Sequence, residues 1–321
     1  MNDRQFFSNA ARIALISSFS ILLTACGGGD SGSSDSSQSD SSQLSATSAS
    51  SARSRNSGHG RNSGTSTGSG TTTGSGTGTG TGTSTGSGTS TTVAGPAGQD
   101  ASLYTLTFSD DFNSFNSSAW NDHIWYETSN ATQNYTVENG VLKIWPQRDA
   151  TGNFFNRAID TDGKFYQTYG YFEMEAQLPI GKGTWPAFWL YNHDQADHPE
   201  IDIMEAYAGG TSPWGDNNDH PTAYGTTAWP TGGNGSSYFK QNTTPDLSAG
   251  FHKYGLKWEP SKLTFYFDGS AVYTVNVTMS SRMYILLDLW YGSASGTPDS
   301  TTPTGKTNSY QINYVRAWQF K

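Results

Sequence analysis

Short runs in which apolar and polar residues alternate dominate the chain from about residue 100 onward. One such run is Leu263–Phe267, and the turn residues Asp268 and Gly269 follow it directly. A period of two is typical of a β-strand with one buried face, and Gly, Asn, Asp and Pro between the runs indicate turns. The pattern predicts an antiparallel all-β domain over residues 101–321, of the size expected for a large β-sandwich.

The first residues have a different pattern. Basic residues precede an apolar run from Ile13 to Leu23, which is too short to span a bilayer, and small residues then lead to Cys26. This order predicts a secretory signal over residues 1–26. The Leu-Thr-Ala-Cys box resembles that of bacterial lipoproteins, which implies a lipid on Cys26 that anchors the protein to a membrane. Because Gly27 follows the cysteine, we expect the outer membrane or cell surface. An ordinary secretory signal with an incidental cysteine is the alternative.

Residues 27–100 consist mostly of Ser, Gly and Thr. Such a composition cannot bury enough apolar surface to become ordered, so we expect a disordered linker between the anchor and the domain. Cys26 is the only cysteine of the chain, which excludes an internal disulfide and a catalytic thiol in the exported domain.

Charge and aromatic content narrow the class of partner. The chain has 18 basic and 27 acidic residues, of which 5 and 4 lie in the first 99, so the remainder carries 13 against 23, a net charge of −10. This balance argues against nucleic acid and strongly anionic polymers. The chain has 43 aromatic residues, 10 Trp, 17 Tyr and 16 Phe, and 40 of them follow residue 100. We therefore expect the ligand to be a neutral polysaccharide. We also expect the protein to be a monomer.

Three carboxylates stand close together in Glu200–Glu205, a segment that otherwise has the pattern of a buried strand. Because side chains alternate along a strand, Glu200 and Asp202 share a face, and Glu205 is out of phase by one residue. A β-bulge between Asp202 and Glu205 would bring all three acids to one face. The two glutamate carboxyls would then lie about 5–5.5 Å apart, as in retaining glycosidases. A solvated strand face without chemistry is the alternative.

The Glu200–Glu205 segment resembles the E-x-D-x-x-E signature of glycoside hydrolase family 16 in its bulged form. Other landmarks follow in the order that the family has, and they extend the resemblance over about residues 104–321. These landmarks are Leu106–Asn113, Val137–Ile144, Thr161–Glu175, Trp185–Trp189, Phe251–Trp258, Tyr266–Gly269 and Asn313–Gln319. The resemblance implies a β-jelly-roll sandwich of two antiparallel sheets, with a substrate cleft across the concave face.

The same resemblance implies an endo-acting glycosidase of the laminarinase or β-glucanase kind. Glu200 would be the nucleophile and Glu205 the acid and base of a retaining double displacement, while Asp202 would tune the pair. This mechanism needs no cofactor. We expect a neutral β-1,3- or β-1,3-1,4-glucan as substrate. A bacterial exopolysaccharide or a galactan is the alternative substrate, and a lectin that binds glycan without cleaving it is the alternative function.

Aromatic and basic residues around the acids are candidates for substrate binding. Trp185 and Trp189 are expected to form a platform for sugar rings, although each could instead be a core residue. Trp290 is expected to line a distal subsite. Arg157 resembles an arginine that faces the cleft in the family, and a surface salt bridge is the alternative for it.

Two departures from the family pattern concern the substrate. Thr226 and Thr227 stand where many relatives have a histidine on the strand that faces the acids, and Leu286–Gly296 stands where laminarinase-like members have an Asn-Leu-Ala run. These changes leave the particular glycan open.

A structural Ca²⁺ is common in the family, and the resemblance implies a site at Asp111, Gly140 and Asn313. Asn313 stands in place of the usual aspartate, which weakens the expected site.

Overall fold

The computed structural model describes residues 94–211, 215–232, 237–243 and 245–321. The expected signal over residues 1–26, its Cys26, and most of the expected linker lie outside the described residues. In the part that is described, strands make up nearly all regular structure, and none of the helices there has the length and hydropathy needed to cross a membrane.

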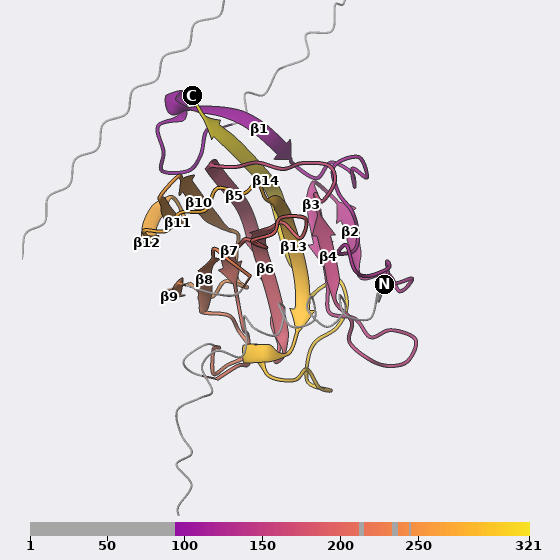
Figure 1. Ribbon diagram of the computed structural model, residues 1–321. Coiled ribbons are helices and arrows are strands. Elements are labelled where there is room, and N and C mark those ends of the chain that lie inside the picture. The colour runs from indigo at the N-terminus through magenta and orange to yellow at the C-terminus, as the bar shows by residue number, and fades with distance from the viewer. Residues whose placement is uncertain (1–93, 212–214, 233–236, 244) are drawn as a thin grey trace, which may run out of the picture. The chain divides into compact units, whose positions relative to one another are not determined.

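The strands form two antiparallel sheets (Figure 1), which confirms the predicted fold class. One sheet has the order β12-β11-β10-β5-β14-β3-β2, with β1 paired to β14, and the other has the order β4-β13-β6-β7-β8-β9. The strands of the first, eight-stranded sheet are β1 (Tyr104–Asp110), β2 (Tyr135–Glu138), β3 (Val141–Ile144), β5 (Gly170–Gln177), β10 (His252–Glu259), β11 (Lys262–Phe267), β12 (Ser270–Val275) and β14 (Tyr310–Phe320). The six-stranded sheet contains β4 (Arg157–Asp160), β6 (Thr184–Tyr191), β7 (Glu200–Glu205), β8 (Ala223–Trp229), β9 (Ser237–Asn242) and β13 (Tyr284–Tyr291). Two short 3-10 helices are η1 (Ala101–Leu103) and η2 (Ser293–Ser295).

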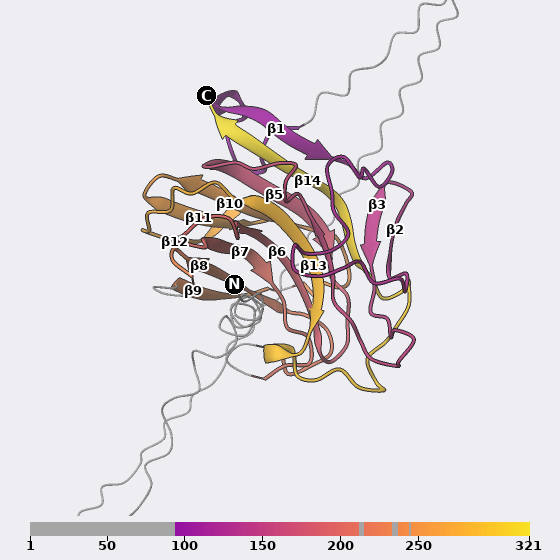
Figure 2. The same ribbon diagram turned by 45° about the vertical axis from the view of Figure 1, so that its right-hand side comes forward.

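The main core lies between the two sheets, which Figure 2 shows as separate layers. Phe172 and Leu256 come from the eight-stranded sheet, and Phe188, Ile201 and Leu287 from the six-stranded sheet, and all five are fully buried. Burying one such side chain contributes about 1.5–3 kcal/mol. The alternation that the sequence shows therefore fixes which residues of each strand face the other sheet and which face away.

A second apolar cluster covers the opposite face of the six-stranded sheet, which we call the outer face. Its members from the strands are Ala158, Trp185, Tyr191, Tyr284, Leu286 and Trp290, and none of them belongs to the core between the sheets. Ile124 and Tyr126 of the preceding loop pack on the same cluster. The outer face is therefore rich in aromatic rings, and residues that alternate with core positions project onto it.

The contacts of the domain begin slightly before Ala101, where we had placed its boundary. The Ala97 amide donates a hydrogen bond to Glu173 Oε2 at 2.9 Å, and Glu173 is only 2% exposed. Gly98 has a φ of +71°, and a Cβ at this position would lie 1.9 Å from the Gly269 carbonyl oxygen. The close approach of two chain segments therefore requires glycine at residue 98.

Candidate active site

Strand β7 contains the β-bulge that the phase of the three acids predicts. Against β6, Phe188 pairs with Met204 and Trp189 with Asp202, so Ile203 is the extra residue. Ile203 and Met204 are adjacent in the chain, yet both lie in the core between the sheets and are at most 1% exposed. The prediction is confirmed, and the bulge returns Glu205 to the face that carries Asp202.

Cross-strand pairs arrange the outer face in rows that run perpendicular to the strands. In one row, Glu205 of β7 pairs with Ala187 of β6. Ala187 in turn pairs with Asp288 of β13. Asp288 pairs with Ala158 of β4, at the edge of the sheet. Ala158 and Ala187 have small side chains, so this row has little bulk beside its two carboxyls. The row links the acids of β7 to the β4 edge of the sheet.

Two indole groups donate hydrogen bonds to the acids of β7. Trp185 Nε1 lies 3.0 Å from Glu205 Oε1, and Trp229 Nε1 lies 3.1 Å from Asp202 Oδ2. Both indoles are buried. The Trp185 ring packs against the Tyr207 ring, and Trp229 lies in β8 opposite Glu200. Neutral N–H donors therefore orient Glu205 and Asp202.

Burial dominates the electrostatics of the acids, which are at most 7% exposed. It raises the pKa of Glu200 to about 8, and the charge of Glu205 adds to the shift. Burial also raises the pKa of Glu205 to about 7, against the opposing effect of hydrogen bonds from Tyr207 and Trp185. The pKa of Asp202 rises well above its usual value because of burial and its two acidic neighbours. The group therefore retains protons near neutral pH, as acid catalysis requires.

Asp288 is a fourth buried carboxyl on this face, and it lies within the Leu286–Gly296 run that departs from the family pattern. Its Oδ2 accepts a hydrogen bond from Trp189 Nε1 at 3.1 Å, and its side chain is 3% exposed. Burial raises the pKa of Asp288 well above its usual value, although the bond from Trp189 opposes the shift. An aspartate between leucines in a buried strand was the signal that could have identified it.

The three tryptophans expected to bind substrate lie together on the outer face. Trp290 contacts Trp185 edge to face with ring centroids 5.6 Å apart, and Trp189 with centroids 6.5 Å apart. Trp185 and Trp290 are buried, whereas Trp189 is half-buried. The structure thus brings together the acids and the three rings, and contact with a sugar stays a prediction.

Arg157 lies on the other side of its strand from the position expected. It pairs with Leu289, which belongs to the core between the sheets, whereas the next residue, Ala158, belongs to the outer cluster. A shift of one residue moves a side chain to the opposite face of a strand. We had expected Arg157 to face the cleft, and it is Ala158 that does so.

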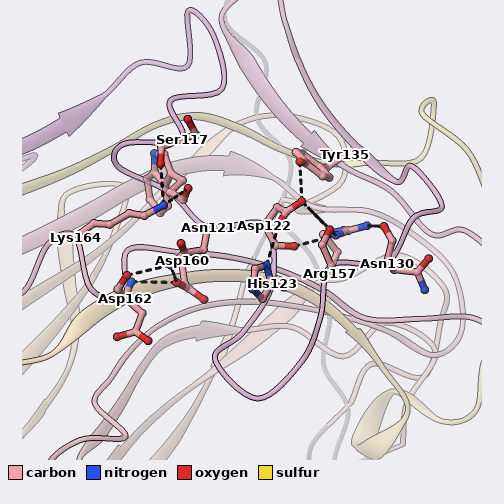
Figure 3. A network of polar contacts seen from close by, with 12 residues as sticks. Ser117, Asn121, Asp122, His123, Asn130, Tyr135, Arg157, Asp160, Asp162 and Lys164 are labelled. Carbon is pink, nitrogen blue, oxygen red and sulfur yellow. Dashed lines mark hydrogen bonds and ion pairs between the residues drawn. The ribbon is translucent and has the colours of Figure 1, made fainter.

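The Arg157 guanidinium instead holds the loop before β2 (Figure 3). Its N–H groups donate to Asn134 Oδ1, to Ser129 Oγ and to three backbone oxygens, and the side chain is 2% exposed. The three carbonyl oxygens belong to Asp122, Asn130 and Thr132. The arginine therefore has its donors occupied within the protein.

This loop and the residues before β4 enclose a pocket of about 550 Å³ at the β4 edge of the sheet. The pocket is lined by Asp122, His123, Tyr126, Glu127, Thr128, Asn130, Phe154, Phe155, Asn156, Arg157 and Ala158. This pocket could not be predicted from the sequence, because two segments about 30 residues apart form its walls.

The residues expected to bind calcium do not fit that ion. Asp111 Oδ1 lies 2.6 Å from Arg316 Nη2, so a guanidinium already neutralises this carboxylate. Asn313 Nδ2 donates to Glu175 Oε2 at 2.9 Å, although Gly140 does lie near the Asp111 backbone. Among the residues described, no cluster of three or more His, Cys, Asp or Glu side chains could hold a metal ion.

Comparisons with known proteins agree with this geometry. The sequence matches the family of glycosyl hydrolases, family 16, over residues 121–316. The chain belongs to this family. Endo-1,3-1,4-beta-glycanase ExsH of Rhizobium meliloti is 29% identical over 256 residues, which cover 68% of this chain and 52% of that protein. The chain thus spans about half the length of this relative.

Other relatives are similar over more of their own length. A beta-glucanase of Rhodothermus marinus is 26% identical over 62% of this chain and 75% of that protein. The catalytic domain of a laminarinase from Thermotoga maritima has a similar structure, with a TM-score of 0.55 and 25% identity over 68% of this chain and 99% of that one. These likenesses support a glycosidase with the fold described above.

The raised pKa of Glu200 makes stability depend on pH in a direction that can be tested. The folded state binds this proton more tightly than the unfolded state, so its contribution to stability is complete below the ordinary value of 4.5 and is lost as pH rises to about 8. Glu200→Gln is neutral throughout. We expect the variant to match the wild type at acid pH and to exceed its free energy of unfolding by on the order of a few kcal/mol at alkaline pH.

Urea unfolding at several pH values measures this difference. Glu138→Gln is the control with the opposite sign, because bonds from Lys143 and Lys306 lower the pKa of Glu138. A Glu200→Gln variant no more stable than the wild type at alkaline pH would contradict the assignment.

Proposed function

We propose that the protein is a retaining endo-glycosidase that cleaves a neutral β-1,3- or β-1,3-1,4-glucan. The observation that carries the proposal is the bulge of β7, which presents Glu200, Asp202 and Glu205 on one face beside three tryptophans. Hydrolysis of a glycosidic bond needs an ionised carboxyl at the anomeric carbon and a protonated one at the leaving oxygen. Acids whose pKa values are raised together can hold one proton between them and supply both forms.

Each acid has a separate step in this proposal. Glu200 attacks the anomeric carbon and forms a glycosyl-enzyme while Glu205 donates a proton to the departing sugar. Glu205 then removes a proton from water, which displaces Glu200 and restores the free enzyme. Burial raises the pKa values of both glutamates, so the pair can hold a shared proton, and the first step needs that proton on Glu205. Asp202, which lies between the two along β7, helps to keep Glu200 ionised by holding a proton itself.

The neutral character of the substrate follows from the surroundings of the acids. Four buried carboxyls occupy this face, and the ion pairs of the described residues include none of them. With no cation paired to them, these groups offer an anionic polymer no attraction, and the carboxyl that is ionised favours the positive charge that develops on the sugar ring. Relatives whose names give β-1,3 or β-1,3-1,4 glycan activity support the choice of linkage.

Product sizes test the proposed reaction. An endo-acting enzyme should release oligosaccharides of several lengths early in the digestion of laminarin or mixed-linkage glucan. Release of monosaccharide alone, or activity confined to uronic or sulfated polymers, would contradict the proposal. Binding of these glucans without any new reducing ends would identify a lectin instead.

Substitutions of the acids test their separate roles. Glu200→Gln and Glu205→Gln should each lower kcat by several orders of magnitude, because each removes a reacting group and changes little volume. Asp202→Asn should be less damaging, since Asp202 does not bond to the substrate in the proposed steps. Circular dichroism of the variants controls for folding. Substantial turnover by either glutamine variant would refute the assigned roles.

We also propose that a lipid on Cys26 holds the enzyme at the outer membrane or cell surface. The support is the signal-like sequence before Cys26, which lies outside the described residues. Cys26→Ser should release the protein from the membrane fraction while its specific activity stays the same. Unchanged membrane association of this variant would contradict the anchor.

A further inference from the structure

We propose that Tyr207 is a positioning residue for Glu205, whose carboxyl it holds, through a hydrogen bond from its hydroxyl, where the proton passes to the glycosidic oxygen. Tyr207 bonds to no part of the substrate and keeps its own proton in both steps. The inference rests on the proposed function and adds to it a residue outside the Glu200–Glu205 segment.

The backbone places Tyr207 on the same face of the sheet as Glu205. Just beyond the end of β7, Ala206 belongs to the core between the sheets and Tyr207 to the aromatic cluster of the outer face. The Ala206 amide donates to the Pro186 carbonyl oxygen of β6 at 3.1 Å, so the pairing of β7 with β6 continues past Glu205. Alternation along extended backbone therefore makes Tyr207 the next residue on the outer face.

The chain segment that carries Tyr207 is tied to β8. The Tyr207 carbonyl oxygen accepts hydrogen bonds from the amides of Asp216 at 3.0 Å and Gly210 at 3.3 Å. The Asp216 carboxyl in turn accepts from the amides of Thr222 at 2.6 Å and Ala223 at 3.1 Å, where β8 begins. These bonds fix the main chain from which the tyrosine ring projects.

Tyr207 and Trp185 both donate to the Glu205 carboxyl. The Tyr207 side chain is 3% exposed, and its ring packs against the Trp185 ring with centroids 5.6 Å apart. Trp185 Nε1 lies 3.0 Å from Glu205 Oε1, and the Tyr207 hydroxyl forms a second hydrogen bond to the same carboxyl. Of these two bonds, the one from Tyr207 lowers the pKa of Glu205 more. Two packed donors leave the carboxyl little freedom to rotate, as proton transfer over a short distance requires.

The Tyr207 hydroxyl remains a donor near neutral pH. Burial and the charge of Glu205 raise the pKa of Tyr207 well above its usual value, so the hydroxyl keeps its proton. A hydroxyl bonds more strongly to a carboxylate than to a neutral carboxyl group, so this bond favours the ionised form of Glu205. It makes Glu205 a stronger acid in the first step than burial alone would, and it stabilises the base of the second step.

The pH dependence of Tyr207→Phe tests this role, because the variant removes the hydroxyl and keeps the ring that packs on Trp185. For cleavage of glucan, kcat/KM should fall at high pH as Glu205 loses the proton that it donates. Without the bond that lowers this pKa, the fall should move to higher pH by about one unit, equivalent to about 1.4 kcal/mol. The other titratable groups that act on Glu205 or respond to its charge are the same in both proteins: Glu200 and Asp202 of β7, Asp288 of β13 and Tyr238 of β9.

A second substrate separates positioning of the acid from a general loss of structure. An aryl β-glycoside with an acidic phenol departs without a proton from Glu205. At the optimum pH of the wild type, Tyr207→Phe should lower kcat/KM about tenfold on glucan and at most about twofold on the aryl glycoside.

Tyr284→Phe is the matched control. Tyr284 is buried in the same outer cluster, and its hydroxyl has no hydrogen-bond partner among the described residues. This variant should match the wild type on both substrates and over the whole pH range.

Two results would overturn the role of Tyr207. One is an unchanged pH profile of Tyr207→Phe on glucan, and the other is an equal loss of kcat/KM on glucan and aryl glycoside. A wild type that cleaves neither substrate would overturn the proposed function, and the role of Tyr207 with it, so the two failures are distinguishable.

Discussion

The structure of this domain depends on the burial of carboxyl groups on one face of a β-sheet. Removing an ionised carboxylate from water costs several kcal/mol even after the protein relaxes. The protein reduces this penalty with no cation paired to these acids among the described residues, since indole N–H groups donate to Glu205, Asp202 and Asp288 and the acids retain protons. A neutral donor stabilises a carboxylate less than a cation would, which leaves the pKa values high and the acids suited to proton transfer.

The core between the sheets holds these acids in place. A bulge is an irregularity that a strand avoids unless neighbouring residues fix it. Here Ile203 and Met204 both insert into that core, where their apolar surface is removed from water. Sliding β7 by one residue would move one of them to the polar face and Glu205 into the core. The hydrophobic effect therefore determines where a catalytic group points, because exposing either side chain would cost about 1.5–3 kcal/mol.

The sequence predicted the parts of the site that depend on a single strand. The phase of Glu205 against Glu200 was enough to predict the bulge. The side of the sheet on which Arg157 lies could not be predicted in this way. In a short edge strand, an error of one residue in the expected register places a side chain on the opposite face. The pocket at the β4 edge was beyond prediction, since it needs the loop of Asp122 to meet residues 154–158, and only the tertiary fold sets that distance.

The indole bonds to the acids also give the domain optical probes of its own chemistry. Trp185, Trp189 and Trp229 each have an N–H hydrogen-bonded to a carboxyl oxygen. Indole emission is sensitive to neighbouring charge, so the protonation state of each acid is coupled to the excited state of one ring. The fluorescence of the unlabelled protein therefore depends on the protonation states of these acids, at equilibrium and during a single turnover.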